Sequence, residues 1–292
     1  MNPKALLTYA KTHADTFTQG GISSNSIRFF EYGGKRYVLK LPLMTGDRLS
    51  PFWQMMKNIL GFTFEKQSER LEALCRRLAE NPHIKTAPFL AADRDAMLYG
   101  FIEGTAGPDD RFPDAGDNAF RLGQYIGFNH AVAHARCGML GKEDVEDFFS
   151  AALRHMEACV RCHWTEDTPL DAAVRDFFAK LKTQRLESSR YSLIMGDMSA
   201  DQFLFDKDGR IVACVDLDAY VIAPVEWELS MLKTQVSDWE SFQKGYACYQ
   251  NMPDFAAMQD FFYFLMALNA YNSKNELEND WAPLFTAPFL HT

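Results

Sequence analysis

The stretch "SLIMGDMSADQFLFDKDGRIVACVDLDAY", residues 192–220, sets three acidic side chains in an otherwise apolar background. Asp197, Asp216 and Asp218 lie close to "FLF" and "IVACV", two runs that are typical of buried strands. A carboxylate that is buried without a partner is costly or becomes protonated, so acids at strand ends need a partner. We therefore predict that these carboxylates face a functional site, where a metal ion is one candidate partner.

The composition limits the class of protein. The 292 residues are 47% apolar and 24% charged, which is typical of a globular protein with one large domain or two lobes. A net charge of −9, without a cluster of Lys and Arg, argues against a nucleic-acid partner. The N-terminus lacks the apolar core of a secretory signal, and "FFYFLMALNAY" is too short to span a membrane. We therefore expect a cytoplasmic protein without a membrane span.

The cysteines are expected to be reduced thiols, because six of them in a chain of this length do not suggest a disulfide framework. Cys159, Cys162 and His163, in "CVRCH", match the attachment pattern of a c-type haem. The pattern ends a stretch with apolar residues at helical spacing, and haem attachment requires export. We interpret it as part of a helix.

The first hundred residues predict a small β-rich unit. "GGISSNSIRFFEYGGKRYVLKL", residues 20–41, indicates two strands joined by a turn at Gly33 and Gly34. The segment "MTGDRLSPFWQMMKNILGF", residues 44–62, has an irregular pattern. "MLYGFIEG" indicates a further strand that ends at Gly104, and the polar "TAGPDDRFPDAGD" after it marks a lobe boundary.

A helix is predicted over residues 64–79. The apolar residues that share one of its faces are Phe64, Leu71, Leu74, Cys75 and Leu78. From Asn118 onward the pattern is mainly helical, interrupted by the 192–220 stretch.

The predicted elements follow the order of a protein-kinase-like fold. The first is a strand that ends in Lys40, and a helix and a strand that leads into a hinge follow it. A helical region with two acids at strand ends comes last. Within it, "MGDMSADQFLFDKDGRIVACVDLDA" resembles the catalytic segment of the aminoglycoside phosphotransferase family, H-G-D-x-x-x-x-N followed by a hairpin and I-D-x-[DE]. The late segments "FQKGY" and "NMPDF" also look like the family. The resemblance implies an α+β, bilobal fold, with a small β-rich nucleotide-binding lobe over residues 1–103 and a mostly helical catalytic and substrate lobe over residues 104–292.

The same resemblance implies an enzyme that transfers the γ-phosphate of ATP, with Mg²⁺, to a hydroxyl of a small molecule. Asp197 would accept or orient the proton of that hydroxyl. Asp216 would bind magnesium, because a hard cation prefers carboxylate oxygen, and Gln202 stands at the position of a second metal ligand. Lys40, at the end of "RYVLK", would hold the α- and β-phosphates.

Further nucleotide contacts are expected from the N-terminal lobe. "GGISSNS" would cover the phosphates through Gly20, Gly21, Ser23 and Ser24, although an ordinary flexible turn is an equal alternative. The backbone of Ile102 and Glu103 would bind adenine.

The carboxylate that would pair with Lys40 is harder to choose. Glu72 and Glu65 both flank the apolar face of the 64–79 helix, Gln67 lies at its centre, and Glu69 points nearly opposite. We select Glu72, with a solvated surface acid as the alternative.

The sequence also departs from the family pattern. Met195 stands where the family has His, and Gln202 stands where it has Asn; Gln keeps the amide oxygen but adds a methylene. The main hypothesis is a phosphotransferase with an aminoglycoside, amino-sugar, choline-like or lipid-sugar acceptor. The alternative is a pseudokinase, a nucleotide-binding regulatory module without turnover. Asp197 favours the enzyme, whereas Gln202 favours the alternative.

Overall fold

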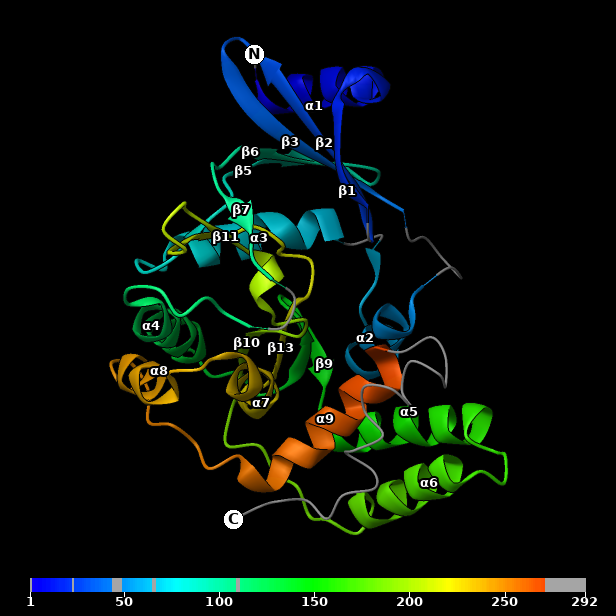
Figure 1. The fold of residues 1–292 in the computed structure, drawn as a ribbon. Helices are drawn as coiled ribbons and strands as arrows, with labels where there is room; N and C mark the ends of the chain where they lie inside the picture. The colour runs from blue at the N-terminus through cyan, green and yellow to red at the C-terminus, as the bar shows by residue number, and fades with distance from the viewer. Residues whose placement is uncertain (1, 23, 44–48, 65–66, 109–110, 271–292) are drawn as a thin grey trace.

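An antiparallel sheet forms the upper part of the molecule, and a tight turn sets its register (Figure 1). The structure is a computed structural model that describes residues 2–22, 24–43, 49–64, 67–108 and 111–270. Gly33 and Gly34 have φ of 58° and 71°, the left-handed backbone that glycine adopts without strain in a two-residue hairpin turn. The turn pairs Tyr32 with Lys35, which confirms the predicted hairpin. In order across the sheet, the strands are β1 (Thr18–Ile22), β2 (Asn25–Tyr32), β3 (Lys35–Pro42), β6 (Met97–Gly100) and β5 (Phe89–Ala92).

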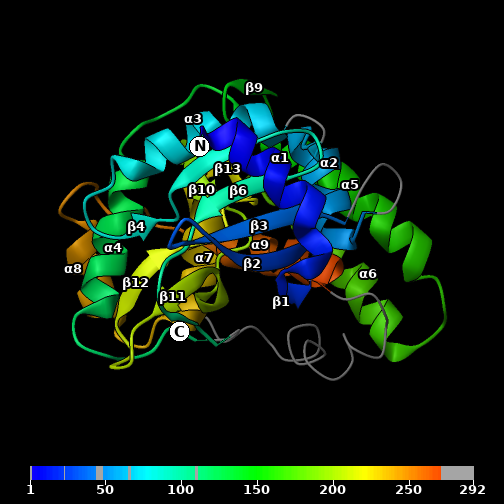
Figure 2. The same ribbon diagram turned by 90° about the horizontal axis from the view of Figure 1, so that it is seen from above.

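Helices lie above and below this sheet (Figures 1 and 2). Above it, α1 (Pro3–His13), which is followed by the short helix η1 (Ala14–Thr16), packs into a separate small core with the sheet. Below it lies α3 (Gln67–Ala79), at the position of the predicted 64–79 helix. The predicted apolar face of α3 is buried, as the low exposure of Leu71, Leu74, Cys75 and Leu78 shows.

The strand that leads out of the upper sheet is shorter than predicted. β6 ends at Gly100 and not at Gly104, and β7 (Thr105–Ala106) then pairs with β11 (Phe203–Phe205). A Cβ on Gly104 would lie 2.9 Å from Cβ of Leu204, so only glycine lets the connection approach β11 this closely. The connection therefore joins the upper sheet directly to the hairpin of the 192–220 stretch.

The "FLF" and "IVACV" runs form the predicted hairpin, β11 with β12 (Ile211–Cys214), in which Phe203 pairs with Cys214. Their sheet has the order β4-β12-β11-β7, with β4 at Lys85–Thr86. A further sheet has the order β10-β13-β8-β9. Its strands are β10 (Tyr191–Met195), β13 (Tyr220–Pro224), β8 (Cys137–Met139) and β9 (Lys142–Val145). The sequence did not predict β8 or β9.

Helices make up most of the lower part, as predicted for the region after Asn118 (Figure 1). They are α4 (Asn118–His130), α5 (Phe148–His163), α6 (Pro169–Leu181), η3 (Ala200–Gln202), α7 (Val225–Gln235), α8 (Trp239–Tyr246) and α9 (Ala256–Ala270). Among the helices in the described ranges, none is long and apolar enough to cross a membrane.

One helix, α2 (Pro51–Leu60), lies in the segment that the sequence left irregular. Ser50 accepts a hydrogen bond from the Trp53 backbone and caps the helix, which Pro51 starts and Gly61, with φ of 66°, ends. Residues 44–48 of the same segment lie outside the described residues. Although α2 precedes the predicted lobe boundary, it packs against α5 and α9 in the lower part of the molecule (Figure 1).

All six cysteines are free thiols, in keeping with the expected reduced state. Cys159, Cys162 and His163 lie at the end of α5, the helix that the spacing predicted. The Cys159 thiol lies 3.5 Å from Nε2 of His155 on the previous turn of the same helix.

Candidate functional site

Lys40 lies at the centre of an ion-pair cluster that links the upper sheet to the 192–220 stretch. β3 carries this buried side chain, and its Nζ lies 2.9 Å from Oδ1 of Asp216 and 3.9 Å from Oδ2 of Asp218. Burial acts to lower the pKa of the ammonium, but the two carboxylates outweigh it and raise the pKa, so Lys40 stays cationic. The structure thus brings the predicted phosphate-binding lysine and the predicted metal-binding acid together, and Asp216 remains 31% exposed.

A second contact links the first hairpin to the same cluster. Asn25, the first residue of β2, is buried and donates from Nδ2 to Oδ2 of Asp218 at 2.6 Å. Burial raises the pKa of the Asp218 carboxyl, against the opposing charge of Lys40. From α3, Arg70 donates to the backbone carbonyls of Asp218 and Tyr220.

Sequence reasoning missed both Asn25 and Arg70. Arg70 lies one turn before Leu74 on the apolar face of α3, and a basic residue at such a position was a usable signal that it has a buried partner. Nothing in the local sequence distinguished Asn25 from its polar neighbours.

Asp197 follows β10 on a loop that is held through its backbone. Gly196 N donates to the carbonyl of Ala219 at 3.0 Å. Asp197 is half-buried, and burial, together with the charges of Asp216 and Asp201, raises the pKa of its carboxyl to about 7. A carboxyl that titrates near neutral pH is suited to proton transfer at that pH.

The residue before this loop is anchored by a buried carboxylate. Glu228 of α7 accepts a hydrogen bond from Met195 N at 2.7 Å and lies 2.8 Å from Nε2 of His130. Nδ1 of His130 in turn lies 3.0 Å from the Tyr246 hydroxyl. Met195, which replaces the family's His, is therefore held by its backbone and not through a polar side chain.

Replacing Glu228 with Leu should lower the free energy of unfolding by about 3 kcal/mol, because it leaves a buried backbone donor and a buried His without their acceptor. Urea denaturation of the full chain measures this change. The matched control is Glu240→Ala, because Glu240 pairs with Lys244 on the exposed face of α8 and should contribute less than about 1 kcal/mol. Equal stability of the two variants would show that the buried network does not hold the loop.

Gln202 lies at the end of η3, next to the acids. Its Nε2 donates to Oδ1 of Asp201 at 3.0 Å, and its backbone carbonyl accepts from Val215 N at 2.9 Å, which fixes it beside Asp216. Asp201, which also accepts from the Ser199 hydroxyl, was missed by sequence reasoning. Its position four residues after Asp197 was the available sequence signal that Asp201 belongs to the site.

An acidic cavity of about 510 Å³ contains these side chains. Those that carry chemistry are Asp197, Asp201, Gln202, Asp216, Asp218, Ser24 and Ser50. The oxygen-rich donors fit Mg²⁺, which usually takes one or two protein carboxylates together with phosphate oxygens. Within the described ranges, no three His, Cys, Asp or Glu side chains converge closely enough to hold a metal ion by themselves. A metal would therefore be held jointly with a bound phosphate group.

An apolar cavity of about 320 Å³ adjoins the acidic one, and Asp201 and Asp216 line both. Its apolar walls include Val38, Tyr99, Ile102, Leu204 and Val215, with Lys40 among the remaining lining residues. Apolar walls with a charged side chain among them suit a ligand that joins an apolar ring to a charged group.

Ile102 and Glu103 lie on the connection at this cavity. Within the described part of the chain, no hydrogen bond engages the backbone of either residue. The Glu103 side chain pairs with Arg36, which lies over the ring of Phe101. The backbone groups expected to bind adenine are therefore available.

The residues predicted to cover the phosphates do not all lie at the acidic cavity. Gly20 lies in β1, where a Cβ would meet the Phe29 ring at 2.6 Å, so close packing against that side chain favours a glycine there. Gly21 lies in the same strand. Ser24 lines the acidic cavity, whereas Ser23 lies outside the described residues.

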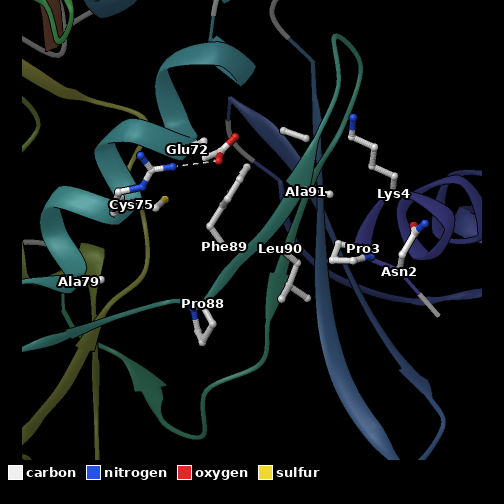
Figure 3. A pocket seen from close by; sticks show the side chains of 12 residues that line it. Asn2, Pro3, Lys4, Glu72, Cys75, Ala79, Pro88, Phe89, Leu90 and Ala91 are labelled. Carbon is white, nitrogen blue, oxygen red and sulfur yellow. Dashed lines mark hydrogen bonds and ion pairs between the residues drawn. The ribbon is translucent and has the colours of Figure 1, made fainter.

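The expected pairing of Glu72 with Lys40 is corrected. Glu72 is exposed and pairs with Arg76 at 3.1 Å, one turn along α3. Both side chains line a separate cavity of about 600 Å³ between α3, β5 and the start of α1 (Figure 3). The buried face of α3 turns Arg70 inward and Glu72 outward, so the two ion pairs described for Lys40 are with Asp216 and Asp218. Glu65 lies outside the described residues.

The sequence model of the phosphotransferase enzyme family matches residues 19–261, which covers most of the chain. The chain belongs to the phosphotransferase enzyme family. The predicted aminoglycoside phosphotransferase-like family is thereby confirmed. No curated protein gives a significant sequence match.

Solved structures of low sequence identity share the fold of this phosphotransferase. The macrolide 2'-phosphotransferase of Brachybacterium faecium is 19% identical, with a TM-score of 0.56 and 98% of each chain covered. The streptomycin–ATP complex of APH(2'')-IIa is 12% identical, with a TM-score of 0.59 and coverage of 95% of this chain and 97% of the other. Choline kinase LicA of Streptococcus pneumoniae is 11% identical, with a TM-score of 0.54 and coverage of 91% and 89%. The predicted α+β, bilobal, protein-kinase-like fold is confirmed.

Proposed function

We propose that this phosphotransferase moves the γ-phosphate of ATP to a hydroxyl group of a small molecule. The observation that carries the proposal is the 2.9 Å pair between Lys40 and Asp216, because Asp216 lies where the apolar cavity meets the acidic one. Adenine would occupy the apolar cavity against Ile102, and the phosphates would extend past Lys40 toward Asp197. The predicted division into lobes at residues 103 and 104 would then place the nucleotide at the hinge.

The residues take distinct roles in the transfer. Lys40 would bind the α- and β-phosphates, and Asp216 with Gln202 would hold Mg²⁺, which would supply positive charge to neutralise the phosphates. Asp197 accepts the proton of the acceptor hydroxyl while the oxygen of that hydroxyl forms a bond to the γ-phosphorus. The bond from that phosphorus to the bridging oxygen breaks, and ADP leaves.

A pseudokinase is the second candidate, and the position of Gln202 favours it. Its amide already donates to Asp201, and its side chain is longer than the Asn of the family. ADP release with aminoglycoside, amino-sugar, choline-like and lipid-sugar acceptors separates the two functions. Magnesium-dependent turnover with one of them supports the enzyme, whereas nucleotide binding without turnover on any of them supports the pseudokinase.

Replacing Asn25 with Asp should weaken Mg-ATP binding by about tenfold or more, because a second carboxylate would face Asp218 in place of an amide donor. The repulsion separates the first hairpin from the acid cluster that it covers. Calorimetric titration with Mg-ATP measures the loss. Asn251→Asp is the control for added charge, because Asn251 is exposed between α8 and α9. Unchanged affinity in Asn25→Asp would show that the contact does not matter for nucleotide binding.

A further inference from the structure

Asp201 lies where the two cavities of the candidate site meet. It belongs to η3, and together with Asp216 it lines both the apolar and the acidic cavity. β7 packs closely against η3, because a Cβ on Gly107, the residue after β7, would lie 2.4 Å from the carbonyl oxygen of Ala200. The Asp201 side chain is therefore placed beside the connection that joins the upper sheet to β11.

The Asp201 carboxylate is fixed through one of its two oxygens. Oδ1 accepts hydrogen bonds from the Ser199 hydroxyl and from Nε2 of Gln202, the latter at 3.0 Å. No residue that the structure describes donates to Oδ2, and no Lys, Arg or His of those residues forms an ion pair with Asp201. The side chain is half-buried, and a carboxylate oxygen that is withdrawn from water needs a donor. Oδ2 is therefore available to a ligand.

A nucleotide that binds as proposed brings its ribose to this junction. Adenine would lie in the apolar cavity and the phosphates at Lys40, and the ribose is the group that joins them. Among the ionisable side chains that line the apolar cavity, Lys40 and Asp216 would be engaged by phosphate and metal. Tyr99 is buried in β6, and its hydroxyl donates to the Met97 sulfur at 3.9 Å. The ionisable side chain that remains for the sugar is Asp201.

The chemistry of the sugar matches that of the free oxygen. The 2′- and 3′-hydroxyls of ribose can donate hydrogen bonds, whereas an ionised carboxylate can only accept them. Such a bond to a charged acceptor is about twice as strong as one between neutral groups. We propose that Asp201 makes this phosphotransferase selective for ribonucleotides, because its Oδ2 accepts a hydrogen bond from a ribose hydroxyl of bound ATP. This inference rests on the proposed function, since it concerns the nucleotide of that reaction.

The test compares nucleotides that differ in one hydroxyl. Calorimetric titration of the full chain with ATP, 2′-deoxy-ATP and 3′-deoxy-ATP, each with Mg²⁺ and without an acceptor, measures their affinities. At least one of the deoxynucleotides is expected to bind about tenfold more weakly than ATP, because a hydrogen bond to a charged group is lost. Equal affinities for all three nucleotides would overturn the inference.

Asp201→Ala assigns the selectivity to the carboxylate. In this variant the affinity for ATP should fall by about the factor that separates ATP from the weaker deoxynucleotide in the parent protein. The affinity for that deoxynucleotide should change by less than about twofold, because it does not use the carboxylate. Asp208→Ala, in the exposed turn after β11, should keep the selectivity of the parent protein. An equal loss for ATP and the deoxynucleotides in Asp201→Ala would show that Asp201 acts on the phosphates or the metal, which would also overturn the inference.

Failure of this inference is distinguishable from failure of the proposed function. The comparison in the parent protein needs no variant, so it tests the inference even if Asp201→Ala does not fold. Equal binding of the three nucleotides, or an unchanged selectivity in Asp201→Ala, would overturn the role of Asp201 and leave Mg-ATP binding intact. A parent protein that binds none of the nucleotides would instead overturn the proposed function, and this inference with it.

Discussion

Asp197→Asn is expected to lower the turnover number of acceptor phosphorylation by about 10³-fold, because Asn cannot accept the hydroxyl proton. The affinity for Mg-ATP should stay within about twofold, since the proposed role of Asp197 concerns the acceptor and not the phosphates. Initial rates of ADP release, measured beside a calorimetric ATP titration, separate the two quantities. Asp208→Asn, in the exposed turn after β11, is the matched control for the loss of a carboxylate.

The same substitution should change stability with a characteristic pH dependence. The pKa of Asp197 is raised from 3.8 to about 7, so the folded protein binds its proton more tightly than the unfolded chain does. Stability contributed by this group is therefore present at low pH and lost as the pH rises from about 4 to about 7. Because Asn carries no such charge, Asp197→Asn should raise the Tm by about 2 to 4 °C at pH 8 and leave it unchanged at pH 4.

Two results would contradict these roles of Asp197. An unchanged turnover number would show that the carboxylate is not the base. A Tm that falls equally at pH 4 and pH 8 would show that Asp197 stabilises the loop by its hydrogen bonding.

Asp216→Asn is expected to weaken Mg-ATP binding by at least about 100-fold, because loss of groups that merely support a metal ligand already costs 10 to 100-fold. The substitution removes the negative charge that a hard cation prefers, and it also removes the closer carboxylate partner of Lys40. Titration of ATP with and without magnesium distinguishes these losses. The loss of ATP affinity that remains without magnesium measures the effect of removing the closer carboxylate partner of Lys40.

Gln202→Asn serves as the contrast to Asp216→Asn. It keeps the amide and restores the shorter side chain of the family, so binding and turnover should be preserved or improved. If Asp216→Asn binds Mg-ATP like the parent protein, the acids of the 192–220 stretch serve the fold, and the kinase assignment loses its main support. Circular dichroism of both variants controls for folding.

Sequence reasoning succeeded where local pattern determines structure. Gly33 and Gly34 marked the first hairpin because a two-residue turn needs left-handed backbone. "FLF" and "IVACV" indicated β11 and β12 because continuous apolar runs are typical of buried strands. These two hairpins carry or flank Lys40, Asp197 and Asp216, so the centre of the site was predictable.

The remaining parts depend on contacts between distant segments. Asn25 and Asp218 are separated by 193 positions, and their contact exists only because the first hairpin closes over the acid cluster. Glu72 was misassigned because helical spacing identifies the buried face but does not say which flanking residue turns toward Lys40. Helix α2 had readable signals at Ser50, Pro51 and Gly61, but its packing against α5 and α9 could not be read from them.

The most direct test of the proposed phosphotransfer site is a crystal structure of the full chain with Mn²⁺ and a non-hydrolysable ATP analogue. Manganese takes the place of magnesium and is located by its anomalous signal. We expect adenine in the apolar cavity against Ile102, phosphates at Lys40, and a manganese peak bound by Asp216, with the γ-phosphate facing Asp197. A nucleotide bound away from Lys40, or a manganese peak that Asp216 does not touch, would contradict it.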